Sequence, residues 1–185
     1  MRILPCFFIY LLCLPAFSQG SPGLKGGLNY ANVKLTENGV NASHSPLIGF
    51  HIGLFFEGDP NKKITLQPEA ILSLQGTKHH IDEKLLYVNV PILIKYRFVK
   101  HVVGYVGPQL GILAHTNEIN GRPVSNFYNR FDLSTIIGLQ YLGTKGFRTG
   151  IRYNYGIVNI AEEDDFEDAD ARNRVLQFYA GFLLD

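Results

Sequence analysis

Hydrophobic residues recur at every second position over much of the chain. Between residues 47 and 56, one face carries only large apolar side chains, namely Ile48, Phe50, Ile52, Leu54 and Phe56. The same period is clear at 87–98, 131–141 and 147–157, and it is less regular at 24–34, 63–76, 102–115 and 173–184. Because successive side chains of a β-strand point to opposite faces of the sheet, this period predicts eight strands.

The connections between these segments alternate in length. Those at 35–45, 77–84, 116–126 and 160–172 are long, whereas those at 57–62, 99–101 and 143–146 are short. Tight turns at one end and longer loops at the other are typical of bacterial outer-membrane barrels, whose short turns face the periplasm. The pattern therefore predicts an all-β fold, an eight-stranded antiparallel up-and-down transmembrane β-barrel.

The N-terminus has the pattern of a secretory signal peptide. Arg2 supplies a positive charge before an apolar run at 3–17, and small residues follow where a signal peptidase would cut. A helix over that run would rise only about 22 Å, whereas a hydrocarbon core is roughly 30 Å thick. We expect cleavage before Gln19, which leaves a signal peptide at 1–18 and an outer-membrane β-barrel domain at 19–185.

Composition and charge exclude several classes of protein. Both cysteines, Cys6 and Cys13, lie in the signal peptide, so the mature chain has no disulfide and must be stabilised by backbone pairing and packing. The chain has 17 basic and 16 acidic residues, and loss of Arg2 makes these numbers equal. Balanced charge argues against capture of a polyanion, so we expect no nucleic-acid partner.

The distribution of side-chain size predicts which face of the strands meets lipid. Lipid cannot solvate charge, so a membrane barrel places its apolar face outward and its polar face inward. Nine glycines share the polar face, which suits the narrow interior of an eight-stranded barrel. Aromatic residues near the short turns are expected to form one interfacial girdle, comprising Phe56, Tyr96, Phe98, Tyr141, Phe147 and Phe182.

Ionisable side chains on the predicted inner face are the main candidates for function. They are Lys25, Glu69, Lys95, Arg97, Asp132, Arg148 and Arg152. One interpretation is an ion or proton path. We favour a structural network of charges and hydrogen bonds that plugs the barrel, with the surplus of basic groups met by trapped water or by residues near the rims. We do not expect a general diffusion porin, since water-filled channels need about 16 strands.

Other chemistry has weaker support. His79 and His80 with Asp82 and Glu83 are a possible metal site, but adjacent histidines do not converge as a helical pair does. The acidic run at 162–170 lacks the spacing of a calcium loop, and we expect a solvated loop with, at most, weak cation contact. A hydrolase triad would have to be assembled from His51, Ser73, Glu69 and Ser134, without a nucleophile elbow. We expect no enzyme activity and no cofactor.

Several short motifs together resemble one family. They are GLKGGLN at 23–29, GFHIG at 49–53, LQPE at 66–69, VPILIKY at 90–96, GPQLG at 107–111, RYNYG at 152–156 and NRVLQ at 173–177. This set is similar to the PorT-like outer-membrane β-barrel domain family of Gram-negative bacteria. The resemblance implies an eight-stranded barrel, and some relatives serve protein secretion. One departure is the C-terminus, where these barrels usually end on an aromatic residue and this chain ends in Asp185.

The leading hypothesis is therefore an integral outer-membrane protein with a plugged polar interior. Its barrel would anchor surface loops for envelope, adhesion or secretion-related interaction. We expect a monomer whose partners are outer-membrane lipid and lipopolysaccharide, with a possible envelope or secretion protein. The alternative is a secreted soluble lipocalin-like barrel that binds a small apolar ligand against Ile137 and Ile151. A third hypothesis, a lipid hydrolase or acyltransferase, would depend on His51.

Overall fold

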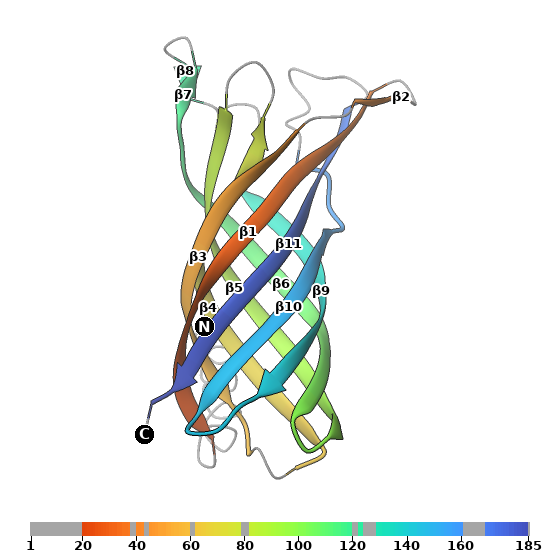
Figure 1. Cartoon of the computed structure of the whole chain (residues 1–185). Helices are drawn as coiled ribbons and strands as arrows, with labels where there is room; N and C mark the ends of the chain where they lie inside the picture. Colours follow the sequence, from red (N-terminus) through yellow and green to blue (C-terminus); the bar gives the residue numbers. More distant parts are fainter. Residues whose placement is uncertain are drawn as a thin grey trace, which may run out of the picture.

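Long strands make up almost the whole described chain (Figure 1). The computed structural model describes residues 20–37, 40–42, 45–59, 62–78, 82–119, 122–123, 129–160 and 169–184. The eight long strands are β1 (Ser21–Glu37), β3 (Ser45–Glu57), β4 (Ile64–Lys78), β5 (Asp82–Val99), β6 (Val102–Thr116), β9 (Phe131–Leu142), β10 (Phe147–Gly156) and β11 (Ala169–Leu183). Three short strands were not predicted, namely β2 (Val40–Ala42), β7 (Glu118–Ile119) and β8 (Arg122–Pro123).

The eight long strands close into an antiparallel barrel. Around the barrel their order is β11, β10, β9, β6, β5, β4, β3 and β1, and a β1–β11 ladder joins the two ends. This confirms the predicted fold class. In the part of the chain that the structure describes, no helix has the length and hydrophobicity needed to cross a membrane.

Several strands are longer than their hydrophobic pattern. β5 begins at Asp82, so most of the predicted connection 77–84 is strand, and β11 begins at Ala169 within the predicted connection 160–172. The extra residues continue the backbone ladders, as in the pairs Lys78–Asp82 and Glu37–Ala169. Backbone hydrogen bonds do not require an apolar side chain, so a ladder can extend beyond the alternating segment.

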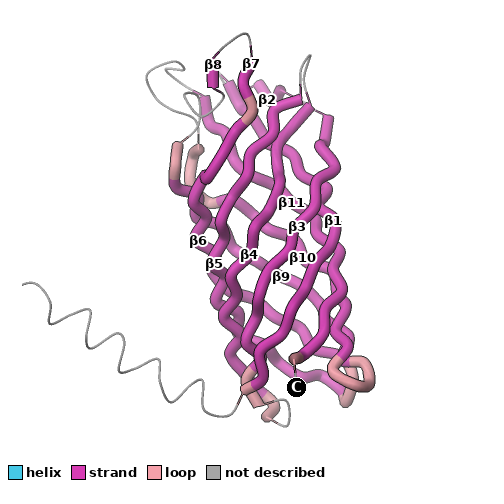
Figure 2. Tube along the Cα trace, turned by 90° about the vertical axis from the view of Figure 1, so that its left-hand side faces the viewer, coloured by secondary structure: helices cyan, strands magenta, loops and turns pink. Residues whose placement is uncertain are grey.

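Short and long connections lie at opposite ends of the barrel, as predicted. The turns β3–β4, β5–β6 and β9–β10 lie at the lower end in Figures 1 and 2, and β2, β7 and β8 lie at the upper end. We call these the short-turn end and the long-loop end. In the β9–β10 turn, Lys145 and Gly146 have φ of 51° and 74°, which allows the chain to reverse within a few residues.

Side-chain exposure confirms the predicted orientation of the two faces. Ile48 and Ile137 on the outer wall are 71% and 61% exposed, whereas Arg152 is 2% exposed in the interior. The lipocalin-like alternative is therefore wrong, because Ile137 and Ile151 point away from the barrel axis. A closed barrel with an apolar exterior is the arrangement that lipid requires.

Aromatic rings fill the interior opposite glycines. Phe55 pairs with Gly23, Tyr105 with Gly138, and Tyr179 with Gly150, each on neighbouring strands. A Cβ atom at any of these glycines would lie closer to the facing side chain than van der Waals contact allows. The inner-face glycines thus leave space for large side chains in a barrel of this small diameter.

Candidate functional site: the polar interior of the barrel

Glu69 of β4 is the centre of one buried ion cluster. Its Oε2 lies 2.5 Å from Lys25 Nζ of β1 and 2.7 Å from Arg152 Nη1 of β10. Lys25 Nζ also lies 4.8 Å from the centroid of the Tyr179 ring, which provides a cation–π contact. We call Lys25, Glu69 and Arg152 the Glu69 cluster. Two cations share one carboxylate here, so the cluster carries a formal surplus of one positive charge.

Glu57 is the centre of a second cluster nearer the short-turn end. Its Oε1 accepts from Lys95 Nζ at 2.9 Å and its Oε2 accepts from Arg148 Nε at 2.7 Å. We call Glu57, Lys95 and Arg148 the Glu57 cluster. Gln67 joins the two clusters, because its Oε1 accepts from Lys95 at 2.8 Å and its Nε2 donates to Glu69 at 2.6 Å.

Glu57 was missed by the sequence analysis, which placed it in the connection 57–62. The structure places it at the last position of β3, with its side chain 3% exposed inside the barrel. The signal was present in the sequence, since Glu57 continues the inward-facing series of His51, Gly53 and Phe55. Its carboxylate offsets part of the basic surplus that the sequence analysis expected.

Six of the seven predicted interior residues are buried in the barrel: Lys25, Glu69, Lys95, Asp132, Arg148 and Arg152. The seventh, Arg97, is half-buried near the short-turn end. Asp132 lies apart from the two ion clusters. Its Oδ2 accepts from Asn173 Nδ2 at 2.9 Å, and no salt bridge to it is found among the described residues.

Asn29 organises a network of neutral side chains beside the Glu69 cluster. Its Nδ2 donates to Ser73 Oγ at 3.0 Å, and its Oδ1 contacts His51 Nδ1 at 2.7 Å and accepts from Gln177 Nε2 at 2.6 Å. Gln177 Oε1 in turn accepts from Arg152 Nε. These side-chain contacts therefore connect the charged centre to two further strands, β3 and β11.

The considered hydrolase triad is not assembled. His51 and Ser73 face each other in the β3–β4 ladder, but both bind Asn29. Glu69 binds Lys25 and Arg152 and does not orient the imidazole. Ser134 accepts from Gln109 on β6. A nucleophile and its base must lie within hydrogen-bond reach and be oriented by a third group, and this arrangement does not provide that geometry.

An apolar cluster lies above the polar interior, toward the long-loop end. We call it the upper apolar cluster; it contains Val33, Leu85, Tyr87, Leu113, Ile160 and Ala171. Ile160 was predicted to begin a loop. Instead its N–H donates to Ala171 O at 2.8 Å and its C=O accepts from Asn129 N at 2.7 Å, which holds the fully buried side chain inside the barrel.

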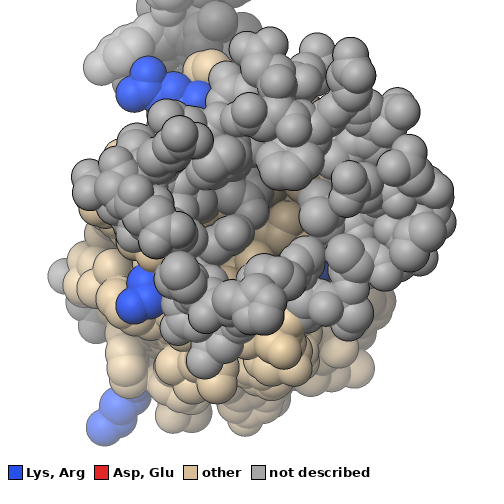
Figure 3. All heavy atoms as spheres, turned by 90° about the horizontal axis from the view of Figure 1, so that it is seen from above, with Lys and Arg blue, Asp and Glu red and all other residues tan. Residues whose placement is uncertain are grey.

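Two predicted features fall outside what the structure describes. His79, His80 and residues 162–168 of the acidic run are not among the described residues, and the side chains of Asp82 and Glu83 are not described either. Within the described ranges, no group of three or more His, Cys, Asp or Glu side chains is placed to hold a metal ion. Seen from above in Figure 3, the visible Lys and Arg atoms lie at separate points and form no single patch.

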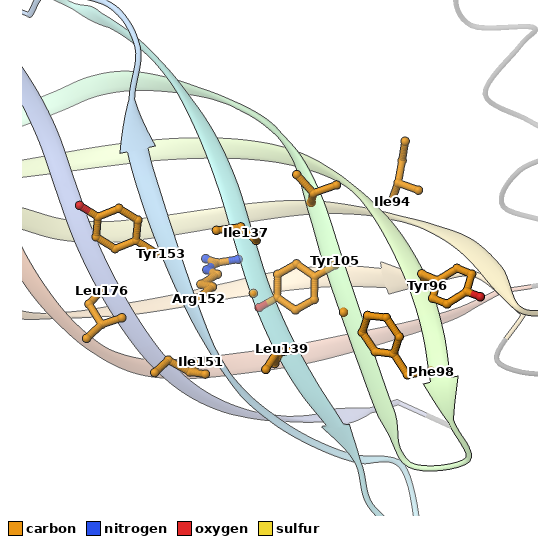
Figure 4. Close-up of a pocket in the computed structure, with 13 residues that line it drawn as sticks. Ile94, Tyr96, Phe98, Tyr105, Ile137, Leu139, Ile151, Arg152, Tyr153 and Leu176 are labelled. Carbon is orange, nitrogen blue, oxygen red and sulfur yellow. The ribbon is translucent and has the colours of Figure 1, made fainter.

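The outer wall carries the predicted aromatic residues near the short-turn end. Tyr96 and Phe98 pack edge to face at 5.3 Å between centroids, and Phe147 and Phe182 pack at 5.1 Å. Tyr96 and Phe98 also border a shallow groove of about 690 Å³ across β5, β6, β9 and β10 (Figure 4). Ile137 and Ile151, the residues of the lipocalin-like alternative, line this groove on the outside of the barrel. The groove therefore faces lipid.

Comparison with known proteins agrees with this architecture. The profile of the family described as outer membrane protein beta-barrel domain matches residues 17–162. The chain belongs to this family. It is therefore an outer-membrane β-barrel protein, and the match covers the strands from β1 to β10, while β11 closes the barrel beyond it.

Solved structures show the same fold at low sequence identity. Neisserial surface protein A has a TM-score of 0.58 and 16% identity, covering 88% of this chain and 97% of its own. OprG from Pseudomonas aeruginosa has a TM-score of 0.50 and 13% identity, covering 90% of this chain and 96% of its own. The attachment invasion locus protein Ail of Yersinia pestis, in a phospholipid bilayer nanodisc, has a TM-score of 0.50 and 18% identity, covering 90% of this chain and 100% of its own. No curated protein matches the chain in sequence.

Proposed function

We propose that this protein is a non-conducting outer-membrane anchor whose long connections bind a partner at the cell surface. The barrel would sit as a monomer among lipid and lipopolysaccharide, with its short turns in the periplasm. The partner would be an adhesion target or a protein of the envelope or of a secretion assembly. The motifs that resemble the PorT-like family support the secretion alternative, and the fold shared with Ail, named for attachment and invasion, supports adhesion.

The contact between Arg152 and Glu69 is the main support for a closed interior. In the circular order of the eight strands, β10 and β4 lie directly opposite each other, so this 2.7 Å ion pair spans the barrel. The Glu57 cluster lies below it and the upper apolar cluster above it. Three successive layers of side chains therefore fill the path that an ion would follow.

Conductance in planar lipid bilayers tests the closed interior. We expect the purified, refolded protein to insert without stepwise current under an applied voltage. The double variant Glu69→Ala/Arg152→Ala removes the side chains that meet across the barrel and is expected to produce small current steps. Regular steps from the unmodified protein would contradict the proposal.

Cell-surface labelling tests the orientation and the role of the connections. An epitope inserted within 124–128 should be reached by antibody on intact cells, whereas the same epitope in the 143–146 turn should be reached only after permeabilisation. Cross-linking from residues 124–128 should then capture a surface or envelope protein. Labelling of the 143–146 turn on intact cells would contradict the proposed orientation.

A further inference from the structure

A small polar niche surrounds Gly111 inside the barrel, directly below the upper apolar cluster. Gly111 of β6 lies between Asn89 of β5 and Asp132 of β9 in one cross-strand row. A Cβ atom at position 111 would lie 2.8 Å from Asn89 Oδ1, 3.3 Å from Asp132 Cβ and 3.5 Å from Tyr87 Cδ1. The three side chains therefore converge on the space that the glycine leaves open.

The side chains around this niche carry buried polar atoms without partners. Asn89 is 1% exposed, Asp132 is 4% exposed and Tyr87 is fully buried. Among the described residues, Asp132 Oδ1, the Tyr87 hydroxyl and both polar side-chain atoms of Asn89 have no hydrogen-bond partner. The same holds for Oε1 of Gln109, the next inward-facing residue along β6. Buried polar atoms without partners are rare in folded proteins, and a group of them points to an ion or water bound among them.

Asp132 differs from the other two buried carboxylates. Glu57 and Glu69 each contact two cationic side chains, whereas Asp132 is bonded to a neutral amide, Asn173. A buried carboxylate needs a compensating charge, because isolating it from water is costly. Neither ion cluster places a cationic side chain in contact with Asp132.

We propose that the Gly111 niche binds one monovalent alkali cation. Its ligands would be the side-chain oxygens of Asp132 and Asn89, with the Tyr87 hydroxyl and Gln109 Oε1 completing an all-oxygen shell. Oxygen donors suit a hard cation rather than a transition metal. A single carboxylate balances one positive charge, whereas a divalent ion would leave a net charge in a low-dielectric site, which is unfavourable.

Cation-dependent thermal stability of the refolded full barrel in detergent micelles tests this site. Unfolding is followed by circular dichroism in NaCl or KCl, with choline chloride added to keep the ionic strength constant. Above the dissociation constant, the melting temperature should rise by roughly 3 to 6 °C for each tenfold increase in alkali cation. In Asp132→Asn the rise should disappear, because the charged ligand is lost.

Two further variants make the result specific. Asn89→Ala removes one ligand oxygen and keeps the carboxylate, so it should weaken the dependence of the melting temperature on alkali cation. If Asp132→Asn does not fold, the result for Asn89→Ala decides the test. Glu57→Gln, in the separate ion cluster, should melt at a lower temperature but keep the full dependence. Equal melting temperatures in NaCl, KCl and choline chloride, an unchanged dependence in Asp132→Asn, or stabilisation by CaCl₂ alone would each overturn the proposal.

Discussion

Arg152 of β10 and Glu69 of β4 form an ion pair across the full width of the barrel, although 83 positions separate them in the sequence. The guanidinium is also bonded to Gln177, and the carboxylate is also bonded to Lys25 and Gln67. Side chains from opposite walls thus meet at the barrel axis. The centre of the interior is a buried polar network, and loss of one partner of a buried ion pair is costly.

Glu69→Gln is expected to destabilise the barrel by about 3 to 5 kcal/mol, because Lys25 and Arg152 would lose the carboxylate that they share. The measurement is urea-induced unfolding in lipid vesicles. The triple variant Lys25→Met/Glu69→Leu/Arg152→Met should be more stable than the single variant, since it removes the uncompensated charges as well. A triple variant less stable than Glu69→Gln would contradict this explanation.

Ile137→Lys is expected to cost about 2 to 4 kcal/mol of folding free energy in lipid, because Ile137 projects from the outer wall. Thr144→Lys is the matched control, since Thr144 is exposed in the β9–β10 turn outside the strands. Its cost should be close to zero. Similar costs for both variants would show that position 137 does not face the hydrocarbon region.

Gly23→Ala is expected to destabilise the barrel by about 1 to 3 kcal/mol through overpacking. Its methyl group would lie 2.6 Å and 2.7 Å from two carbons of the Phe55 ring. Gly26→Ala, on the same strand, is the control, because its methyl group would meet only His51 O at an ordinary 3.4 Å. The two free energies of unfolding should differ clearly, and equal values would argue against the close ring contact.

Ile160→Ala is expected to cost about 2 to 5 kcal/mol, although the residue lies beyond the last strand residue of β10. The reason is the cavity that it would leave in the upper apolar cluster. Val158→Ala, two residues earlier and exposed, should cost little. Comparison of the unfolding midpoints in urea provides the measurement, and equal midpoints would remove Ile160 from the core.

The inward and outward positions of the strands were predictable because side chains alternate strictly along a strand. Once Ile151 is placed in lipid, the position of Arg152, the next residue of β10, on the opposite face follows from local geometry. The eight strands and the ends with short and long connections could be predicted for the same reason, since each depends on residues close together in the sequence.

Tertiary structure decided the contacts inside the barrel. The register of eight strands, and the walls that face each other after closure, decide the interior partners. They pair Arg152 with Glu69 and Arg148 with Glu57, and they leave Asp132 with an amide partner, Asn173. Ile160 enters the core through backbone bonds to residues 129 and 171, which no periodic pattern indicates. The sequence alone determined the two faces of the sheet, because alternation is local; closure of the barrel selected the interior partners, because those contacts form between strands distant in the chain.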